Sequence, residues 1–211
     1  MRQLLLMTCM MAMLVSGTMA RAGTLVGVNG GVDWATIGGS DAPDNVSHRT
    51  GFLGGGFVRR DLNEQYGLQV EVLYVQKGFE GDIHTVDGDV HPGKARLEYV
   101  DIPLEFVARF EGTDKIGFHI FAGPSFNFNI KAEAETEDGF ENDDGRTKNF
   151  EFGAVVGGGV EYRLSSFSIL VDGRYSSGVT TFAEDAAGQS VDVQNRYTAV
   201  MVGIGIPLGP D

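Results

Sequence analysis

A regular alternation of apolar and polar side chains constrains the fold of this chain more than any other feature of its sequence. Between Lys115 and Ile130 all seven positions on one face of the pattern are apolar, against one of seven on the other face. Because successive side chains of a β-strand point to opposite faces, this pattern predicts a strand with one apolar and one polar surface. A helical periodicity is hard to find elsewhere, which indicates an all-β protein.

The alternation recurs along the chain and predicts eight strands. Their ranges are 24–37, 50–60, 66–79, 96–110, 115–130, 150–164, 167–182 and 196–208. Strands of soluble proteins have about 5 to 6 residues, whereas a tilted strand needs about 9 to 11 to cross a bilayer. Apolar outward stripes on strand after strand would also make a soluble, lipocalin-type barrel prone to aggregation. The strands are therefore expected to face lipid.

Long and short connections alternate between these strands. The predicted long loops are 38–49, 80–95, 131–149 and 183–195, and the predicted short turns are 61–65, 111–114 and 165–166. Outer-membrane barrels have short periplasmic turns and longer external loops, and closure leaves no unpaired strand edge in lipid. The sequence therefore predicts an all-β fold, an eight-stranded antiparallel up-and-down transmembrane β-barrel.

The first residues are typical of an export signal. Met1 and Arg2 precede an apolar stretch, and Ala20-Arg21-Ala22 provides the small residues of a cleavage site. We expect residues 1–22 to be a signal peptide and residues 23–211 to be the barrel domain of the mature protein. Cys9, the one cysteine of the chain, leaves with that peptide. The expected location is the bacterial outer membrane.

Charged residues occupy the inward faces of the predicted strands. The predicted lumen network consists of Glu71, Lys77, Asp101, Glu105, Arg109, His119, Glu151, Glu161, Arg163, Asp172 and Arg174, with Arg59 beside them. Its acids and bases nearly balance, which favours mutual pairing because unpaired buried charges are costly. The same residues would either fill the interior of an eight-stranded barrel or line a polar path through it.

The external loops carry most of the acidity of the chain, whose formal net charge is -13. The predicted acidic external loop contains Glu133, Glu135, Glu137, Asp138, Glu141, Asp143 and Asp144. Such a loop attracts divalent cations or a basic partner, or merely keeps the surface solvated. A pI near 4.6 argues against nucleic-acid binding. The predicted partners are outer-membrane lipid and, at the loops, lipopolysaccharide, divalent cations or a protein.

Chemistry-bearing residues form no complete motif. His48, His84 and His91 lie among loop acids, but their spacing matches no zinc motif, and neither Asp-Gly pair continues as a calcium-binding loop. No catalytic residue, metal site or cofactor is predicted. An enzyme at the outer rim remains an alternative that would need its residues gathered there.

Three short motifs, in order, resemble a known family. They are Tyr99-Val100-Asp101-Ile102-Pro103-Leu104, Phe121-Ala122-Gly123-Pro124-Ser125 and Asp172-Gly173-Arg174-Tyr175. With the glycine-rich strands between them, they are similar to the PorT-type outer-membrane β-barrel family over nearly all of residues 24–208. This resemblance implies an eight-stranded barrel in the outer membrane of a Gram-negative-type bacterium and no shared activity. The chain departs from many such barrels in lacking a terminal aromatic residue.

Besides the enzyme at the outer rim, two function classes follow from these features. The preferred hypothesis is a small structural or interaction barrel with a filled lumen, and the alternative is a narrow passive, porin-like channel for ions or small solutes.

Aromatic residues near both strand ends are expected to form interfacial girdles, with Phe79 and Phe182 at the loop side. Pro103 and Pro124 fall inside strands, so we expect bulges or locally broken pairing there.

Overall fold

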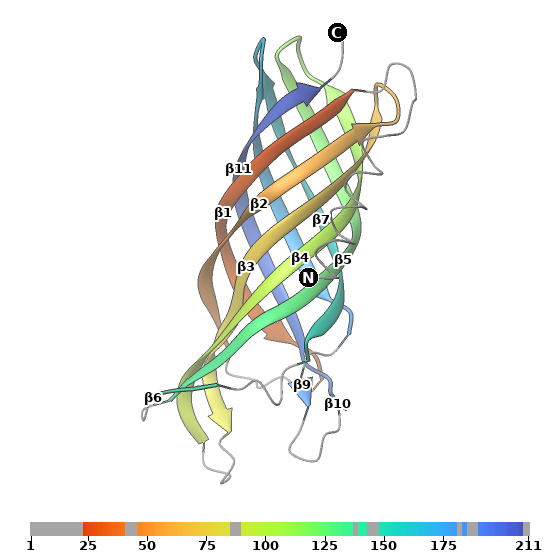
Figure 1. Ribbon diagram of the computed structural model, residues 1–211. Coiled ribbons are helices and arrows are strands. Elements are labelled where there is room, and N and C mark those ends of the chain that lie inside the picture. The colour runs from red at the N-terminus through yellow and green to blue at the C-terminus, as the bar shows by residue number, and fades with distance from the viewer. Residues whose placement is uncertain are drawn as a thin grey trace, which may run out of the picture.

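The chain forms a closed β-barrel (Figure 1) in a computed structural model that describes residues 23–40, 46–84, 90–136, 139–142, 148–180, 183–184 and 190–208. The barrel strands are β1 (Thr24–Gly38), β2 (Ser47–Asp61), β3 (Tyr66–His84), β4 (Val90–Glu111), β5 (Ile116–Thr136), β7 (Phe150–Arg163), β8 (Ser168–Gly178) and β11 (Gln194–Leu208). Three short strands are β6 (Gly139–Asn142), β9 (Ala183–Glu184) and β10 (Ser190–Val191). The predicted signal peptide lies outside the described residues.

Every barrel strand pairs antiparallel with its neighbours along the chain. The barrel closes where β1 pairs with β11, from Thr24 opposite Leu208 to Gly38 opposite Gln194. The pairing of β4 with β5 completes the ring. The predicted all-β, eight-stranded, up-and-down barrel is therefore confirmed.

Short turns join the strands at one end of the barrel, which we call the turn end and which is uppermost in Figure 1. Backbone hydrogen bonds close these turns, from Leu62 to Tyr66 (2.9 Å), Gly112 to Ile116 (3.0 Å) and Leu164 to Phe167 (2.9 Å). The opposite end, where β9 and β10 lie, is the loop end. Among the described residues, no helix is long and apolar enough to cross a membrane.

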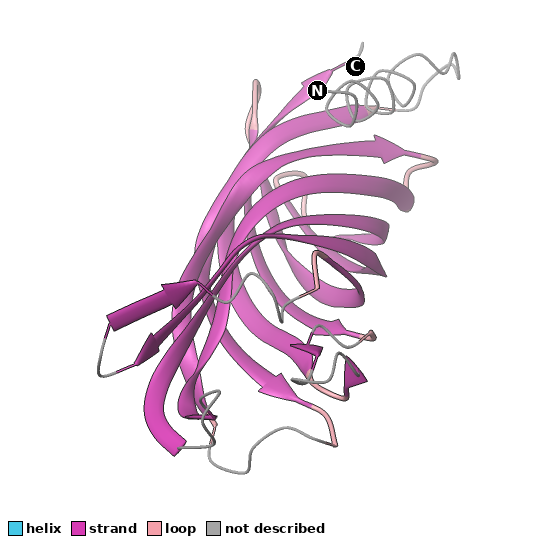
Figure 2. Cartoon of the chain, turned by 60° about the horizontal axis from the view of Figure 1, so that its bottom comes forward, coloured by secondary structure: helices cyan, strands magenta, loops and turns pink. Residues whose placement is uncertain are grey.

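Strands β3, β4 and β5 continue beyond the barrel wall at the loop end, where β6 pairs with β5 (Figures 1 and 2). Residues 80–95 and 131–149 are therefore not simply loops, as predicted, but contain much of these extensions. The register places Arg96 opposite Glu133. Opposite charges across a strand pair stabilise it in water. Apolar alternation identifies only strand segments that face lipid, so it does not predict these extensions.

Two irregularities of β4 and β5 affect the wall of the barrel. The register between β4 and β5 shifts so that Ile130 has no partner on β4, and beyond this bulge Ala132 takes an inward, buried position. Around Pro103 and Pro124 the pairing is interrupted on both sides of β4 without a shift of register. The prolines therefore break the pairing locally, because they lack an N–H group to donate, and produce no bulge.

The outer face of the barrel is apolar, with exposed Val28, Ile120 and Val202 among its residues. Alternation continues through β3, however, so that Phe79 turns inward and packs against an interior apolar cluster. Its predicted place in an outward aromatic girdle is wrong. The period of two already places Phe79 on the same face as Lys77. Phe182 lies outside the described residues.

Candidate functional site

The interior of the barrel is the candidate site, because charged side chains line it on most strands. Its turn-end part is built from ion pairs. Arg59 donates to Glu161 over 2.5 Å, and the Ser168 hydroxyl donates to the second oxygen of that carboxylate over 2.9 Å. Arg59 is 2% exposed. The pair and its serine thus join β2 to β7 and β8 across the lumen, and Arg163 lies 3.7 Å from the second oxygen of the same carboxylate.

Arg109 and Arg163 lie at the rim of the turn end and not in the buried interior. Arg109 pairs with Asp61 (3.0 Å), and Arg163 pairs with Glu111 (3.0 Å). The side chains of these two arginines are 15% and 31% exposed. Exposed pairs of this kind contribute little to stability. Each pair links strand ends across an intervening strand, β4 to β2 over β3 and β7 to β4 over β5.

Arg174 is the centre of the middle layer. Its guanidinium donates to both oxygens of Glu71 (2.7 and 3.1 Å) and lies 3.7 Å from Glu105. The Gln69 amide donates to Glu71 and to Glu105, each over 2.9 Å. A bidentate arginine–carboxylate pair is one of the strongest neutralising contacts in proteins. Two acids therefore share one base, and a neutral amide bridges them.

His119 and Asp172 form a separate pair in the same layer. The Nε2 atom of His119 lies 2.8 Å from Asp172 Oδ1, and the imidazole stacks on Phe121 with ring centroids 6.1 Å apart. Its Nδ1 atom has no hydrogen-bond partner. A histidine and a carboxylate alone are not a catalytic site, which also needs a positioned nucleophile or substrate.

Lys77 occupies the loop-end part of the lumen. Its ammonium group lies 3.0 Å from Asp101 and 4.3 Å from the centroid of the Tyr99 ring. In the same part of the lumen, the Asn195 amide donates to Glu151 (2.9 Å) and to the Tyr99 hydroxyl (3.2 Å). Contact between an ammonium group and an aromatic face is favourable, more so without water. These residues form a second polar layer, distinct from the one around Arg174.

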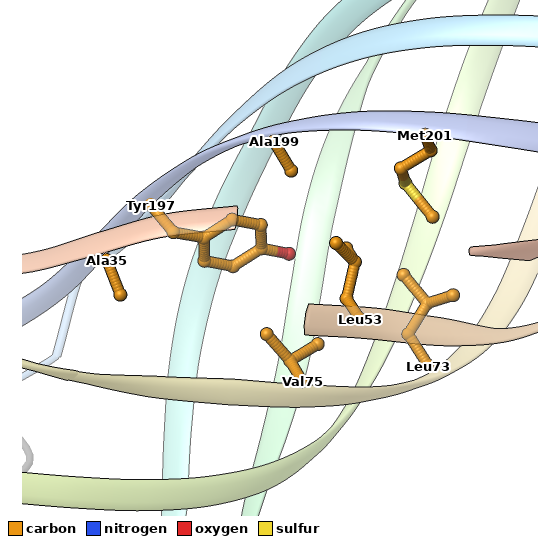
Figure 3. Packing of buried hydrophobic residues seen from close by; sticks show 7 residues of the cluster. All are labelled: Ala35, Leu53, Leu73, Val75, Tyr197, Ala199 and Met201. Atoms are coloured by element: carbon orange, nitrogen blue, oxygen red, sulfur yellow. The ribbon is translucent and has the colours of Figure 1, made fainter. Parts of the chain in front are cut away.

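Apolar clusters separate and cover the polar layers. One cluster packs side chains from β1, β2, β3 and β11 against each other inside the barrel (Figure 3): Ala35, Leu53, Leu73, Val75, Tyr197, Ala199 and Met201. A second cluster lies at the loop end and contains Ile37, Leu97, Tyr99, Ala132 and Val193, with Val46 and Phe79 packed against it. The lumen is therefore filled by apolar as well as charged side chains.

Nine of the eleven predicted lumen residues divide into four groups in the structure. Glu161 belongs to the Arg59 pair, Glu71 and Glu105 surround Arg174, Asp172 contacts His119, and Lys77, Asp101 and Glu151 share the loop-end layer. The remaining two, Arg109 and Arg163, are at the rim.

Asp33 belongs to the interior but was missed by the prediction. It is fully buried on β1, and neither of its carboxylate oxygens has a hydrogen-bond partner. Its signal is present in the sequence, since Asp33 stands between the outward Val32 and Trp34. A polar residue between two lipid-facing residues of one strand must point inward.

The predicted acidic loop is only partly described. Glu133 pairs with Lys131 over 2.8 Å, and Glu135 and Glu141 belong to β5 and β6. Glu137, Asp138, Asp143 and Asp144 lie outside the described residues. His48 is exposed on β2, while His84 and His91 belong to β3 and β4. Within the described part of the chain, no three His, Cys, Asp or Glu side chains are grouped so that they could hold a metal ion.

Comparisons with known proteins agree on the fold. Residues 19–184 match the family described as outer membrane protein beta-barrel domain. The chain is similar to the crystal structure of Neisserial surface protein A (14% identity, 86% of this chain and 96% of that chain covered, TM-score 0.51). It is also similar to the outer membrane protein OprG from Pseudomonas aeruginosa (10% identity, 90% and 97% covered, TM-score 0.49). None of the curated proteins matches the chain.

Proposed function

Because the chain belongs to the outer membrane protein beta-barrel domain family and lies in the bacterial outer membrane, we propose that it is a small structural or interaction barrel with a filled lumen. Short turns of such barrels face the periplasm and longer connections face outside. The loop end is then the external end, where lipopolysaccharide, divalent cations or a protein are the candidate partners. Cleavage after residue 22 and membership of the PorT-type family remain predictions.

The observation that carries this proposal is the burial of interior side chains at successive levels of the barrel. Arg59 near the turn end is 2% exposed, Glu105 in the middle layer is 0% exposed, and Tyr99 at the loop end is 0% exposed. A continuous water path would pass beside the side chains at each level and expose them. An eight-stranded barrel is also only wide enough for side chains to fill it. Both arguments support a closed interior.

The external end offers a charged surface for an interaction role. The extensions of β3, β4, β5 and β6 project from the barrel there (Figure 2). Lys131 and Glu133 share one face of this part of β5 and form an ion pair. The residues that follow in the sequence are rich in acids. An acidic projection of this kind favours cations and basic partners. Outer-membrane lipid contacts the apolar outer face of the barrel wall.

Single-channel conductance of the refolded protein in a planar bilayer tests the proposal. Circular dichroism and protease protection first establish that the protein has folded and inserted. We expect insertion without current steps for the parent. The variant Tyr99→Ala, which removes a large buried side chain at the loop end, serves as an opened control and should conduct more often than the parent.

Steady openings of the parent would instead support the narrow passive channel. If that path follows the interior charges, Glu105→Ala should change its ion selectivity, because Glu105 lies in the middle layer of the lumen. Arg109→Ala, at the rim, should change it less, since water screens exposed charges. Openings that neither substitution alters would contradict both the closed interior and a channel that follows the interior charges.

A further inference from the structure

Arg196 is an outward-facing cation at the loop-end rim of the barrel. On β11 its neighbours in sequence, Asn195 and Tyr197, are buried in the lumen, so alternation directs the Arg196 side chain to the outside. The outward positions of β11 carry no charge from Leu208 to Thr198. Arg196 is therefore the first charge that this strand presents beyond its lipid-facing stripe.

The guanidinium of Arg196 lies over the backbone of Gly38 on β1. A Cβ at Gly38 would come within 2.5 Å of the Nη1 atom of Arg196 and within 2.8 Å of its Nε atom. That Nε atom is buried without a hydrogen-bond partner. Any side chain at Gly38 would displace the guanidinium, so glycine is needed for this close approach.

Asp192 is the acid that acts electrostatically on Arg196, and it already accepts hydrogen bonds from other residues. Its Oδ2 atom accepts from the backbone N–H and the hydroxyl of Ser40 (3.2 and 2.9 Å), and its Oδ1 atom accepts from the Gln194 amide (3.3 Å). An arginine presents five N–H donors in a planar fork that matches the geometry of a phosphate group. Arg196 therefore has donors to offer to an anion from outside the protein.

An apolar surface continues from Arg196 into the membrane. Trp34 on β1 is 41% exposed and lies opposite Thr198, two residues from Arg196 in the direction of the lipid. Aromatic residues near strand ends mark the level of the membrane interface. Further along β11, Val200 and Val202 are exposed on the same face. A phosphate at Arg196 and acyl chains on this face would match the two parts of one lipid molecule.

The acidic projection of the loop end lies on the other side of the barrel. Around the ring, β1 and β11 are neighbours, and they lie opposite the pair formed by β4 and β5. The projection extends from β5 and β6, where the outward Lys131 is neutralised by Glu133 (2.8 Å). The rim at Arg196 is therefore the side at which an anion meets less repulsion from this projection.

We propose that Arg196, with Trp34 beside it, binds the phosphate group of an outer-leaflet lipid such as lipopolysaccharide. This inference rests on the proposed function, because it takes the loop end as the external end, and it selects one of the candidate partners. Conductance tests the interior of the barrel, whereas lipid binding tests its outer rim, so either proposal can fail without the other. Lipid is supplied to both leaflets in the test, so a wrong orientation would not hide the site.

Fluorescence of Trp34 tests the inference, because this residue is the one tryptophan of the chain and reports on lipid beside Arg196. The full chain is refolded in phosphatidylcholine bilayers that contain phosphatidic acid with a spin label on its acyl chain, which quenches nearby tryptophan. Phosphatidic acid presents a phosphate monoester, and equally labelled phosphatidylcholine is the reference. We expect phosphatidic acid to bind beside Trp34 about fivefold more strongly than the reference, as for one arginine near a membrane surface.

Competition identifies the source of the phosphate. The unlabelled lipid part of lipopolysaccharide should displace the labelled phosphatidic acid and restore the fluorescence of Trp34. The same lipid without its phosphates should not. Inorganic phosphate at the same concentration should not displace it either, because it has no acyl chains to place on the apolar face.

Three variants and one control separate binding at this site from a general attraction of charge. Arg196→Gln should abolish the preference for phosphatidic acid, and Arg196→Lys, which keeps the charge without the planar fork, should keep only part of it. Gly38→Ala keeps the arginine but displaces its guanidinium, so it should also weaken the preference. The control is Lys131→Gln, which removes a paired cation from the same rim on the other side of the barrel and should keep the full preference.

Several outcomes would overturn the inference. One is equal quenching of Trp34 by labelled phosphatidic acid and labelled phosphatidylcholine in the parent, and another is a full preference in Arg196→Gln. Equal displacement by the lipid without phosphates would show that apolar contact alone accounts for binding. Displacement by inorganic phosphate would make the free ion the ligand, which contradicts a lipid site.

Discussion

The two halves of the lumen solve the problem of buried charge differently. Around Arg59 and Arg174 near the turn end and middle, carboxylates are joined directly to guanidinium groups, with distances down to 2.5 and 2.7 Å. At the loop end three buried carboxylates, Asp33, Asp101 and Glu151, share Lys77, and four of their oxygens lack hydrogen-bond donors. A near balance of acids and bases over the whole interior therefore conceals a local excess of acid. Charge has to be counted layer by layer.

The largest expected effect compares one carboxylate from each half. Glu161→Gln leaves Arg59 buried without its ion-pair partner, which should cost about 3 to 5 kcal/mol of unfolding free energy. Asp33→Asn breaks no such pair, because neither Asp33 oxygen has a partner. This substitution should therefore not lower the unfolding free energy.

Denaturant titrations of both variants in lipid bilayers measure this difference. Glu71→Gln is a useful intermediate case, since Glu105 remains 3.7 Å from Arg174 and can replace part of the lost contact. Equal losses in Glu161→Gln and Asp33→Asn would show that the two halves are not different in the way described.

The comparison also requires that the charged face point inward, which a substitution on the outer face can test. Ile120 and Ile130 are each 56% exposed on β5, the first within the wall and the second beside the bulge at the loop end. Arginine at the bilayer midplane costs about 2 to 4 kcal/mol, falling to about 0 to 1 near the interface. Ile120→Arg should therefore destabilise the barrel much more than Ile130→Arg.

Unfolding free energies in bilayers again provide the measurement, and the equal exposure of the two residues makes them a matched pair. Ile102→Arg on β4 should behave like Ile120→Arg, since it too lies on the outer face of the wall. If all three variants were as stable as the parent, the assignment of inward and outward faces would be wrong. The description of both halves of the lumen would then be wrong as well.

Much of the fold can be predicted because lipid imposes a simple rule. An outward side chain must be apolar and an inward one is free to be polar, so period two identifies each strand within the membrane. The rule does not apply to segments beyond the lipid, which is why the strand extensions that contain Lys94 and Glu135 were predicted as loops. It also depends on an unbroken count, which the bulge at Ile130 interrupts.

The interior is harder to predict, because contacts across the lumen join strands that are distant along the chain. Alternation places Glu71 and Arg174 on inward faces but cannot pair them, since they are 103 positions apart. Nor can it separate rim residues such as Arg163 from buried ones. Asp33 was accessible to the same counting, but balancing the charges of the whole lumen left no reason to look for another acid.

The smallest expected effect contrasts the unpartnered Asp33 with an aspartate that has donors. At the loop end the backbone N–H of Ser40 and its hydroxyl donate to Asp192 (3.2 and 2.9 Å), and these bonds hold the pKa of Asp192 below its usual range. Such a group stabilises the fold above the ordinary aspartate pKa and loses this contribution as pH falls through the lowered value. Ser40→Ala should raise that pKa only partway, because the backbone donor remains. Carbon-detected NMR titration measures it, with Ser47→Ala as the control, and an unchanged Asp192 pKa in Ser40→Ala would assign the shift to the backbone donor together with Gln194 and Arg196.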